Sequence, residues 1–183
     1  MQTNKSRNFL FYMFGALYFV QGVIQAYQLN FFKPHLNAEG IPADKIATLA
    51  GLALVPFMLK WVFGILSDRV NFFGKGYRVP YMALGVILSA VAFGSAFWIS
   101  PADQFGAMTA VVLIAVSAMT LFDATADALA VDITEPEDHA RVQSVMTGGR
   151  AAGFIILSLV FGIIAERMGF SAIFLVMGVI ILF

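Results

Sequence analysis

The sequence predicts an all-α integral membrane protein in which residues 1–183 form one bundle of six transmembrane helices. Sixty per cent of the residues are hydrophobic and only 12% are charged, about half the charged share of a soluble domain. The apolar residues fall into six long runs separated by short polar segments. A run of about 20 helical residues crosses a ~30 Å hydrocarbon core. We place the helices at about 9–32, 46–66, 80–99, 105–131, 142–165 and 170–183.

The composition also excludes several classes of protein. Lys+Arg and Asp+Glu balance at 11 each, without a basic face, so nucleic acid is not an expected partner. There is no cysteine, which excludes disulfides, thiolate chemistry and cysteine metal sites. The two histidines, His35 and His139, fall in segments expected to be loops. We therefore expect no enzyme, no metal site and no cofactor.

The first expected helix, residues 9–32, follows a polar start with Lys5 and Arg7. Its apolar run is too long for a signal peptide and has no clear cleavage site. Four polar side chains recur at helical spacing along one face: Tyr18, Gln21, Gln25 and Gln28. Such a stripe faces protein or water rather than lipid. It either forms interhelical hydrogen bonds or lines a solute pathway, and the sequence leaves both open.

The second expected helix, residues 46–66, follows a loop with turn-forming Pro and Gly residues and contains Pro56 and Lys60. Lys60 precedes Asp68, near the helix end, by eight residues, or about 12 Å of helix. A lysine closer to the interface could extend to water. At this depth we expect Lys60 to pair with an acid or to bind a ligand. The third expected helix, 80–99, has no charge.

The fourth and fifth expected helices bring opposite charges to one layer of the membrane. Asp123 and Asp127 lie about 13 and 7 Å from the end of the fourth helix at Asp132. Arg150 lies about 13 Å from the start of the fifth helix near Arg141. Charges at this depth usually face a cavity or a partner. We therefore expect Lys60 and these three residues to form one polar site.

The sixth expected helix is still apolar at Phe183, and its 14 residues span only about 21 Å. We expect it to be truncated, so that a missing C-terminal six-helix half or a second copy completes the protein. The basic residues of the loops indicate the orientation. One side would hold Lys5, Arg7, Arg69, Lys75, Arg78 and Arg141, and the other Lys33, Lys45 and Arg167. This favours a cytoplasmic N-terminus in a plasma or inner membrane.

The segment "GILSDR", residues 64–69, resembles the loop signature after helix 2 of the major facilitator superfamily. The matching positions are Gly64, Leu66, Ser67, Asp68 and Arg69, with Arg78 as a counterpart of a later basic position. The resemblance implies a gating network that closes one surface of the bundle and opens when the bundle rocks. Its expected members are Asp68, Arg69, Arg78, Asp132 and Arg141. Anchoring of these charges at the membrane interface is the alternative.

A closer resemblance is to the folate–biopterin transporter family within that superfamily. It rests on "YFVQG" at 18–22, Pro56 and Lys60 ahead of "GILSD", and "FG" and "YRVPY" at 73–81. It continues with Asp123 and Asp127, "QS" at 143–144 and "RAAG" at 150–153. Trp61 departs from the family, which tends to have proline there. The chain is also similar to permeases for peptidoglycan fragments and to bacteriochlorophyll-delivery proteins.

This resemblance implies the N-terminal half of a twelve-helix transporter, built from two inverted three-helix repeats with substrate bound near the midplane. We expect a small organic solute, such as a folate- or pterin-like anion, as the substrate and the lipid bilayer as the surroundings. A membrane assembly or pigment-delivery factor of the same fold, which moves no solute, is the alternative.

The spacing of the acidic residues suggests how such a carrier would be coupled to protons. Asp123 and Asp127 are four residues apart on one helix face. Two carboxylates this close in a low dielectric do not both ionise easily, so one is expected to take up a proton. Arg150 stays charged and can bind an aspartate or a substrate carboxylate. Lys60, Gln21 and Gln25 complete the expected substrate and proton site. A static ion-pair network is the alternative.

Overall fold

The structure is a computed structural model that describes residues 4–71, 74 and 77–182, with side chains from residue 7 onward. The expected residues Phe73, Lys75 and Phe183, and the side chain of Lys5, lie outside the described part. All regular structure in the described part is helical. Five helical spans are long and apolar enough to cross a membrane, and a sixth apolar helix is shorter. The prediction of an all-α membrane protein is confirmed.

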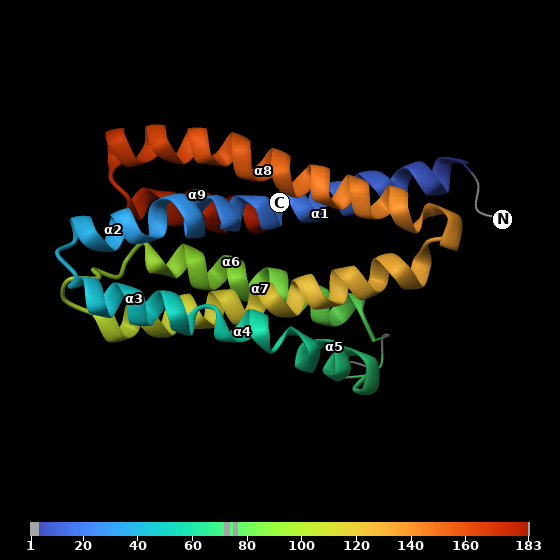
Figure 1. Ribbon diagram of the computed structural model, residues 1–183, viewed down its shortest axis with the longest axis horizontal. Coiled ribbons are helices and arrows are strands. Elements are labelled where there is room, and N and C mark those ends of the chain that lie inside the picture. The colour runs from blue at the N-terminus through green and yellow to red at the C-terminus, as the bar shows by residue number, and fades with distance from the viewer. Residues whose placement is uncertain (1–3, 72–73, 75–76, 183) are drawn as a thin grey trace.

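The described helices follow the chain as six successive spans (Figure 1). The first span contains α1 (Asn4–Ala26), the π-helix η1 (Tyr27–Phe31) and α2 (Phe32–Ala38). The second contains α3 (Ala43–Leu52), α4 (Val55–Met58) and α5 (Lys60–Arg69). The remaining elements are α6 (Val79–Ala96), α7 (Phe105–Ile133), the short 3-10 helix η2 (Pro136–Asp138), α8 (His139–Met168) and α9 (Ser171–Leu182).

The first span continues beyond Phe32, where a loop was expected. Pro34 lies in the first turn of α2, which follows directly on the π-helix η1, so its missing N–H removes one hydrogen bond at this junction without ending the helix. The path turns only at Gly40, whose φ of 74° suits glycine. The expectation of His35 in a loop is therefore wrong. His35 is buried in α2, its Nδ1 lies 2.9 Å from the Tyr27 hydroxyl, and its ring stacks on Phe170.

The second span, expected as one helix over 46–66, is divided into three short helices. Two turns interrupt it, the first at Ala53 and Leu54 and the second at Leu59. Pro56 has no N–H to donate to the carbonyl of Leu52, so the first interruption follows from the sequence locally. The second interruption places Lys60 at the first position of α5. Lys60 therefore lies on α5, which is separate from α3 and α4, the earlier parts of the second span.

Glycines set the packing of the long helices. Along the contact between α1 and α8, Gly149 approaches the backbone of Gly15, and Gly153 approaches the backbone of Phe19. A Cβ atom at either glycine would collide with that backbone. Because both contacts advance in the same direction along the two helices, α1 and α8 run parallel. Close approach at small residues is the usual way in which membrane helices associate.

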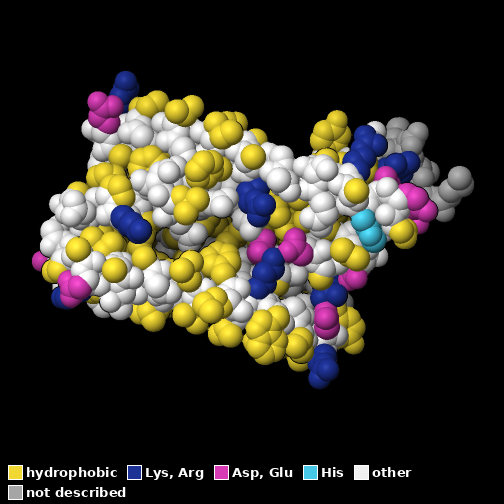
Figure 2. Space-filling view, viewed as in Figure 1, with side chains coloured by type: hydrophobic (Ala, Val, Ile, Leu, Met, Phe, Trp, Pro, Cys, Tyr) yellow, Lys and Arg dark blue, Asp and Glu magenta, His cyan; other side chains and the backbone are white. Residues whose placement is uncertain are grey.

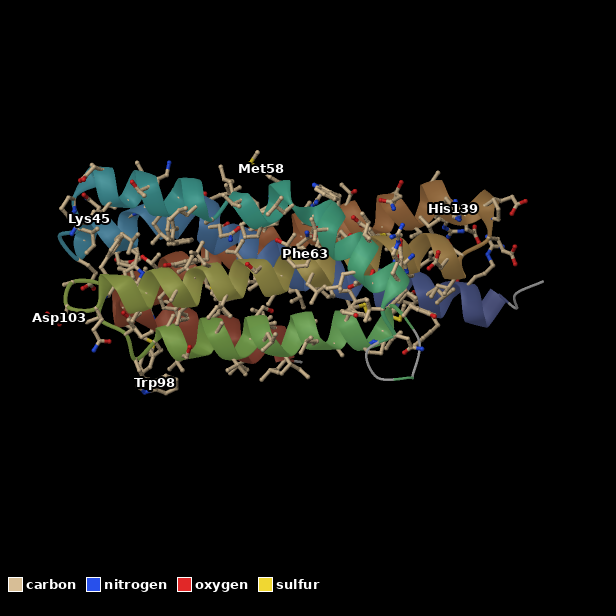
Figure 3. All side chains as sticks on the ribbon, turned by 90° about the horizontal axis from the view of Figure 1, so that it is seen from below. Lys45, Met58, Phe63, Trp98, Asp103 and His139 are labelled. Atoms are coloured by element: carbon tan, nitrogen blue, oxygen red, sulfur yellow. The ribbon has the colours of Figure 1, made fainter. Side chains whose placement is uncertain are left out.

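The spans pair in a regular way. The first packs on the fifth (α1 on α8), the second on the fourth (α5 on α7), and the third on both the fourth and the sixth (α6 on α7 and α9). Figure 3 shows Lys45, Trp98 and Asp103 at one end of the bundle and His139 at the other. The long helices therefore connect two polar ends through an apolar middle, and the charges in that middle are the exception.

Candidate functional site

A lysine and two aspartates lie together in the middle part of the bundle. Lys60 Nζ lies 2.6 Å from Asp123 Oδ2 and 2.5 Å from Asp127 Oδ2. Lys60 begins α5, and the two aspartates are one turn apart on the facing side of α7. Residues four apart on a helix lie above one another, so one ammonium group reaches both carboxylates. We call these three residues, with Tyr18 and Gln21, the Lys60 cluster.

Two side chains of α1 complete the Lys60 cluster. Gln21 Nε2 donates a hydrogen bond of 2.6 Å to Asp123 Oδ1. The Tyr18 hydroxyl lies 3.4 Å from Asp123 Oδ1 and makes a short contact with Asp127 Oδ1. A tyrosine hydroxyl has a single hydrogen, so it can donate to only one of the two carboxylates at a time. Two of the four residues of the polar stripe, Tyr18 and Gln21, thus contact α7. This agrees with the interpretation that the stripe forms interhelical hydrogen bonds.

The two aspartates differ in their access to solvent. The side chain of Asp123 is 9% exposed, whereas those of Asp127 and Lys60 are 40% and 35% exposed. Figure 2 shows acidic and basic side chains gathered midway along one face that is otherwise mostly apolar. Asp127 is therefore the carboxylate that a proton or solute would reach first, and Asp123 is held behind it by Tyr18, Gln21 and Lys60.

The charges within the Lys60 cluster do not balance when both carboxylates are ionised. Two carboxylates and one ammonium give a net charge of −1, since −2 + 1 = −1. An uncompensated charge in a low dielectric is costly. One proton on either aspartate would make the three groups neutral. With both carboxylates ionised, the three groups therefore carry one negative charge in excess of their cation.

Arg150, the other basic residue expected at this depth, is not part of these ion pairs. It lies on α8, and its backbone carbonyl approaches Gly22, the neighbour of Gln21 on α1. Its side chain is half-buried and makes no ion pair or hydrogen bond with the part of the chain that the structure describes. Arg150 was expected to bind an aspartate or a substrate carboxylate. In the structure Lys60 contacts both aspartates and Arg150 contacts neither.

The remaining residues of the polar stripe and the expected substrate site lie further along α1. Gln25 is half-buried and makes no side-chain hydrogen bond with a described residue. Gln28, which is in η1, lines a cavity beside the second span. The structure therefore brings together Lys60, Asp123, Asp127 and Gln21, and leaves Gln25 and Arg150 without protein partners among the described residues.

Three of the five expected gating residues meet at the end of α5. Arg78 Nε donates to Asp132 Oδ2 at 2.9 Å, and the same guanidinium contacts Asp68 closely. It also donates to the hydroxyl of Ser67 at 3.0 Å. We call these four residues the Arg78 network. It joins the ends of α5 and α7 to the start of α6.

Arg69 and Arg141 lie apart from the Arg78 network. Arg69 is exposed and makes no ion pair with a described residue. Arg141 lies over the ring of Phe11, with its guanidinium 4.7 Å from the ring centre, a cation–π contact.

Two interactions were not anticipated from the sequence. Arg7 donates a hydrogen bond of 2.7 Å to Asp138, which ties the start of α1 to the N-cap of α8. Tyr18 was noted as a member of the polar stripe and of the "YFVQG" motif, but the contacts of its hydroxyl with both aspartates were not predicted. The spacing of three between Tyr18 and Gln21 was a signal for a shared role, because it places them on one face. The sequence carried no comparable signal for the Arg7–Asp138 pair.

These features define an integral membrane protein with a partly exposed charged cluster between its spans. Such a site in a membrane bundle usually serves a solute or ion rather than the fold. The model of the BT1 family matches residues 11–183. The chain therefore belongs to the BT1 family, and the expected likeness to folate–biopterin transporters is confirmed.

Individual relatives agree with this assignment. The chain is 31% identical over 170 residues to the folate-biopterin transporter of Synechocystis sp., a match that covers 90% of this chain and 33% of that protein. It is 25% identical over 188 residues to the probable folate-biopterin transporter 7 of Arabidopsis thaliana, covering 99% of this chain and 42% of that protein. The chain thus spans between a third and less than half of these relatives.

Proposed function

We propose that this chain is the N-terminal six-helix half of a proton-coupled secondary transporter for a small organic anion. One observation carries the proposal. Lys60 neutralises one charge of the aspartate pair, while Arg150, in the same layer, has no partner among the described residues. Arg150 is the group that would bind a carboxylate of the substrate.

The charge balance suggests how proton and anion are coupled. Asp123, Asp127, Lys60 and Arg150 together sum to zero, since −2 + 2 = 0. Protons and anionic charges that bind in equal number keep this sum at zero, whereas either alone leaves a net charge in a low dielectric. Each should therefore favour the binding of the other, which is a coupling free energy. The more exposed Asp127 would exchange the proton, and Tyr18 and Gln21 would hold Asp123 in place.

The pairing of the spans supports a major-facilitator half. If spans 1–3 and 4–6 are inverted repeats, span 1 corresponds to span 4, span 2 to span 5 and span 3 to span 6. A contact between spans 1 and 5 then predicts an equivalent contact between spans 4 and 2. The third and sixth spans should then pair with each other. The structure contains all three of these contacts. Substrate sites in such transporters lie near the midplane where repeats meet, which is where the Lys60 cluster lies along the bundle.

The relatives support the choice of substrate. Proteins named folate-biopterin transporters favour a folate- or pterin-like anion, and they favour a carrier over an assembly or pigment-delivery factor. A delivery factor also has no evident need for an aspartate pair that one lysine bridges. A second six-helix half, or a second copy of this chain, would close the other side of the cavity.

The Arg78 network would act as the gate on the cytoplasmic side, with the N-terminus on that side and the protein in a plasma or inner membrane. Its ion pairs connect α5, α6 and α7, so a rocking motion of the half would have to break or carry them. Arg69 and Arg141 do not contact this network in the structure. The gate therefore rests on Asp68, Arg78 and Asp132.

Uptake into proteoliposomes tests the proposed coupling. The full-length protein should take up folate faster as the external pH falls at constant internal pH. Asp127→Asn and Asp123→Asn should each remove this dependence, because an amide takes up no proton at ordinary pH. Arg150→Gln should raise the KM for folate about tenfold or more, as expected for the loss of a charged hydrogen bond.

Asp44→Asn is the matched control, because Asp44 is an exposed acid near the start of α3. It should retain the pH dependence of the natural protein. If both Asp123→Asn and Asp127→Asn also retain that dependence, proton coupling through this pair is wrong.

A further inference from the structure

A cavity of about 290 Å³ lies beside the broken second span, in the half of the bundle away from the Arg78 network. It is enclosed by η1 and the start of α2 on one side and by the end of α3 and α4 on the other. Phe93 of α6 and Val112 of α7 complete its lining. Small-molecule pockets usually measure about 300–1,000 Å³. The cavity is therefore suited to a ring system rather than to a whole elongated substrate.

The interruption of the second span forms part of the cavity wall. Ala53 and Leu54, the residues of the first turn, both line it. Leu54 N–H donates to the carbonyl of Gly51 at 3.1 Å instead of to that of Ala50. Within the described residues, the carbonyls of Ala50 and Ala53 accept no backbone N–H. Unpaired backbone at membrane depth is tolerated where it lines a cavity, and interrupted spans mark binding sites in transporters.

The cavity lies close to the Lys60 cluster along two helices. Gln28 lines it and lies seven residues after Gln21 on the first span, or about 10 Å along the helix axis. Phe57 lines it and lies three residues before Lys60 on the second span. The surface is hollowed on the same face as the gathered acidic and basic side chains (Figure 2). One elongated ligand could reach both places.

The lining specifies the chemistry of the part that would bind. Phe57 and Phe93 offer aromatic surface, which favours a flat ring. Ala50 and Ala53 are lining residues whose carbonyls have no backbone N–H donor among the described residues. A ring that carries N–H donors would satisfy a carbonyl that faces the cavity. Lys33 lies at the exposed rim and makes no ion pair with a described residue, which disfavours a cationic ring.

We propose that this cavity is a second subsite, which binds a planar, uncharged or anionic ring bearing N–H donors, while the Lys60 cluster and Arg150 bind the anionic end about 10 Å away. The position of the anionic end rests on the proposed function. The ring subsite requires only the cavity and the broken helix, and it can be tested without a proton gradient.

A filling substitution at Gly51 tests the ring subsite directly. Gly51 lines the cavity, and a Cβ atom built on it meets no atom within 4 Å, so Gly51→Phe places a ring into open space. Free pterin, whose own fluorescence reports binding, is titrated into the full-length protein in lipid nanodiscs. We expect Gly51→Phe to weaken pterin binding at least tenfold.

Gly162→Phe is the matched control, because Gly162 is a helical glycine of α8 whose added Cβ also meets nothing within 4 Å and which does not line the cavity. It should keep the pterin affinity within about twofold of the natural protein, so it separates filling of the cavity from the general effect of replacing a helical glycine. Equal affinities of Gly51→Phe and Gly162→Phe, or a natural protein that does not bind pterin, would overturn the subsite.

A second probe tests the role of the N–H donors. 1,3-Dimethyllumazine has a similar fused ring without N–H groups, so we expect it to bind at least tenfold more weakly than pterin. Equal binding of the two probes would overturn the assignment of the unpaired carbonyls. Asp127→Asn should still bind pterin. Loss of pH-dependent uptake together with unchanged pterin binding therefore separates the charged site from the ring subsite.

Discussion

The Lys60 cluster and the Arg78 network have the same charge arrangement in different surroundings. In each, one basic side chain contacts two aspartates. Lys60 of α5 contacts two aspartates of α7. Arg78, directly before α6, contacts one aspartate of α5 and one of α7. The Lys60 cluster contains an aspartate that is only 9% exposed. The two aspartates of the Arg78 network are 51% and 50% exposed.

This difference in exposure determines what each arrangement can do. Water and salt screen the two aspartates of the Arg78 network, although Arg78 itself is only 19% exposed, so these ion pairs should break and form again at small cost. In the Lys60 cluster Asp123 is shielded, whereas Lys60 and Asp127 are 35% and 40% exposed. The loss of the cation facing Asp123 must therefore be compensated by a proton, a ligand or a structural change. The comparison shows that two arrangements with the same charge count differ in how far water reaches their carboxylates, which is the basis for the different roles proposed for them.

The largest effect is expected from Lys60→Met, which would leave two carboxylates without their cation. We expect uptake to fall at least 100-fold and the free energy of unfolding to fall by about 2–3 kcal/mol, less than for a fully buried pair because Asp127 is 40% exposed. Thermal unfolding in nanodiscs and proteoliposome uptake measure the two effects.

Lys45→Met is the control for that substitution, because Lys45 is an exposed lysine near the start of α3. The double variant Lys60→Met, Asp127→Asn should recover stability relative to Lys60→Met alone. A double variant that is less stable than the single one would show that the charges of the Lys60 cluster do not act together.

A smaller effect is expected from Arg78→Gln in the Arg78 network. The free energy of unfolding should change by less than about 1 kcal/mol, because exposed ion pairs contribute little. The transport rate should change instead, and the variant should respond less to salt than the natural protein does, since screening acts on exposed charges. If Arg78→Gln destabilises the protein as much as Lys60→Met, the contrast between the two arrangements is wrong.

The smallest effect is expected from Arg69→Gln. Arg69 belongs to the same loop signature as Asp68. Arg69 is exposed and has no ion pair with a described residue. We expect stability to change by no more than about 0.5 kcal/mol, as for other surface substitutions, and the uptake rate to stay within about twofold. A loss of uptake like that of Arg78→Gln would place Arg69 in the gate in another state of the transport cycle.

Several features of the site could be predicted from the sequence because they depend on one helix at a time. The helix rise gives Asp123 and Lys60 a common depth, and the spacing of four places Asp127 one turn away on the same face as Asp123. The spacing of Tyr18 and Gln21 likewise places them together on α1. None of these inferences needs to know how the helices pack.

Other features could not be predicted, because they depend on contacts between distant residues. The sequence offered Lys60 and Arg150 as equally suitable cations, and only the packing of α5 on α7 brings Lys60 to both aspartates. The same holds for Arg7 and Asp138, which are 131 residues apart. The burial of His35 depends on the continuation of the first span into α2 and on its contact with Phe170 of the last span.

The sequence by itself determined that this is an all-helical membrane protein with charges in its interior, because hydrophobic length and helical rise are local properties. It also provided the motifs that associate the chain with folate–biopterin transporters. The tertiary structure decided which charges pair, which cation stays available and where the broken span opens a cavity. Those outcomes depend on the rotation of each helix about its axis, which is set by close contacts such as those of Gly149 and Gly153 with α1 and not by any single segment.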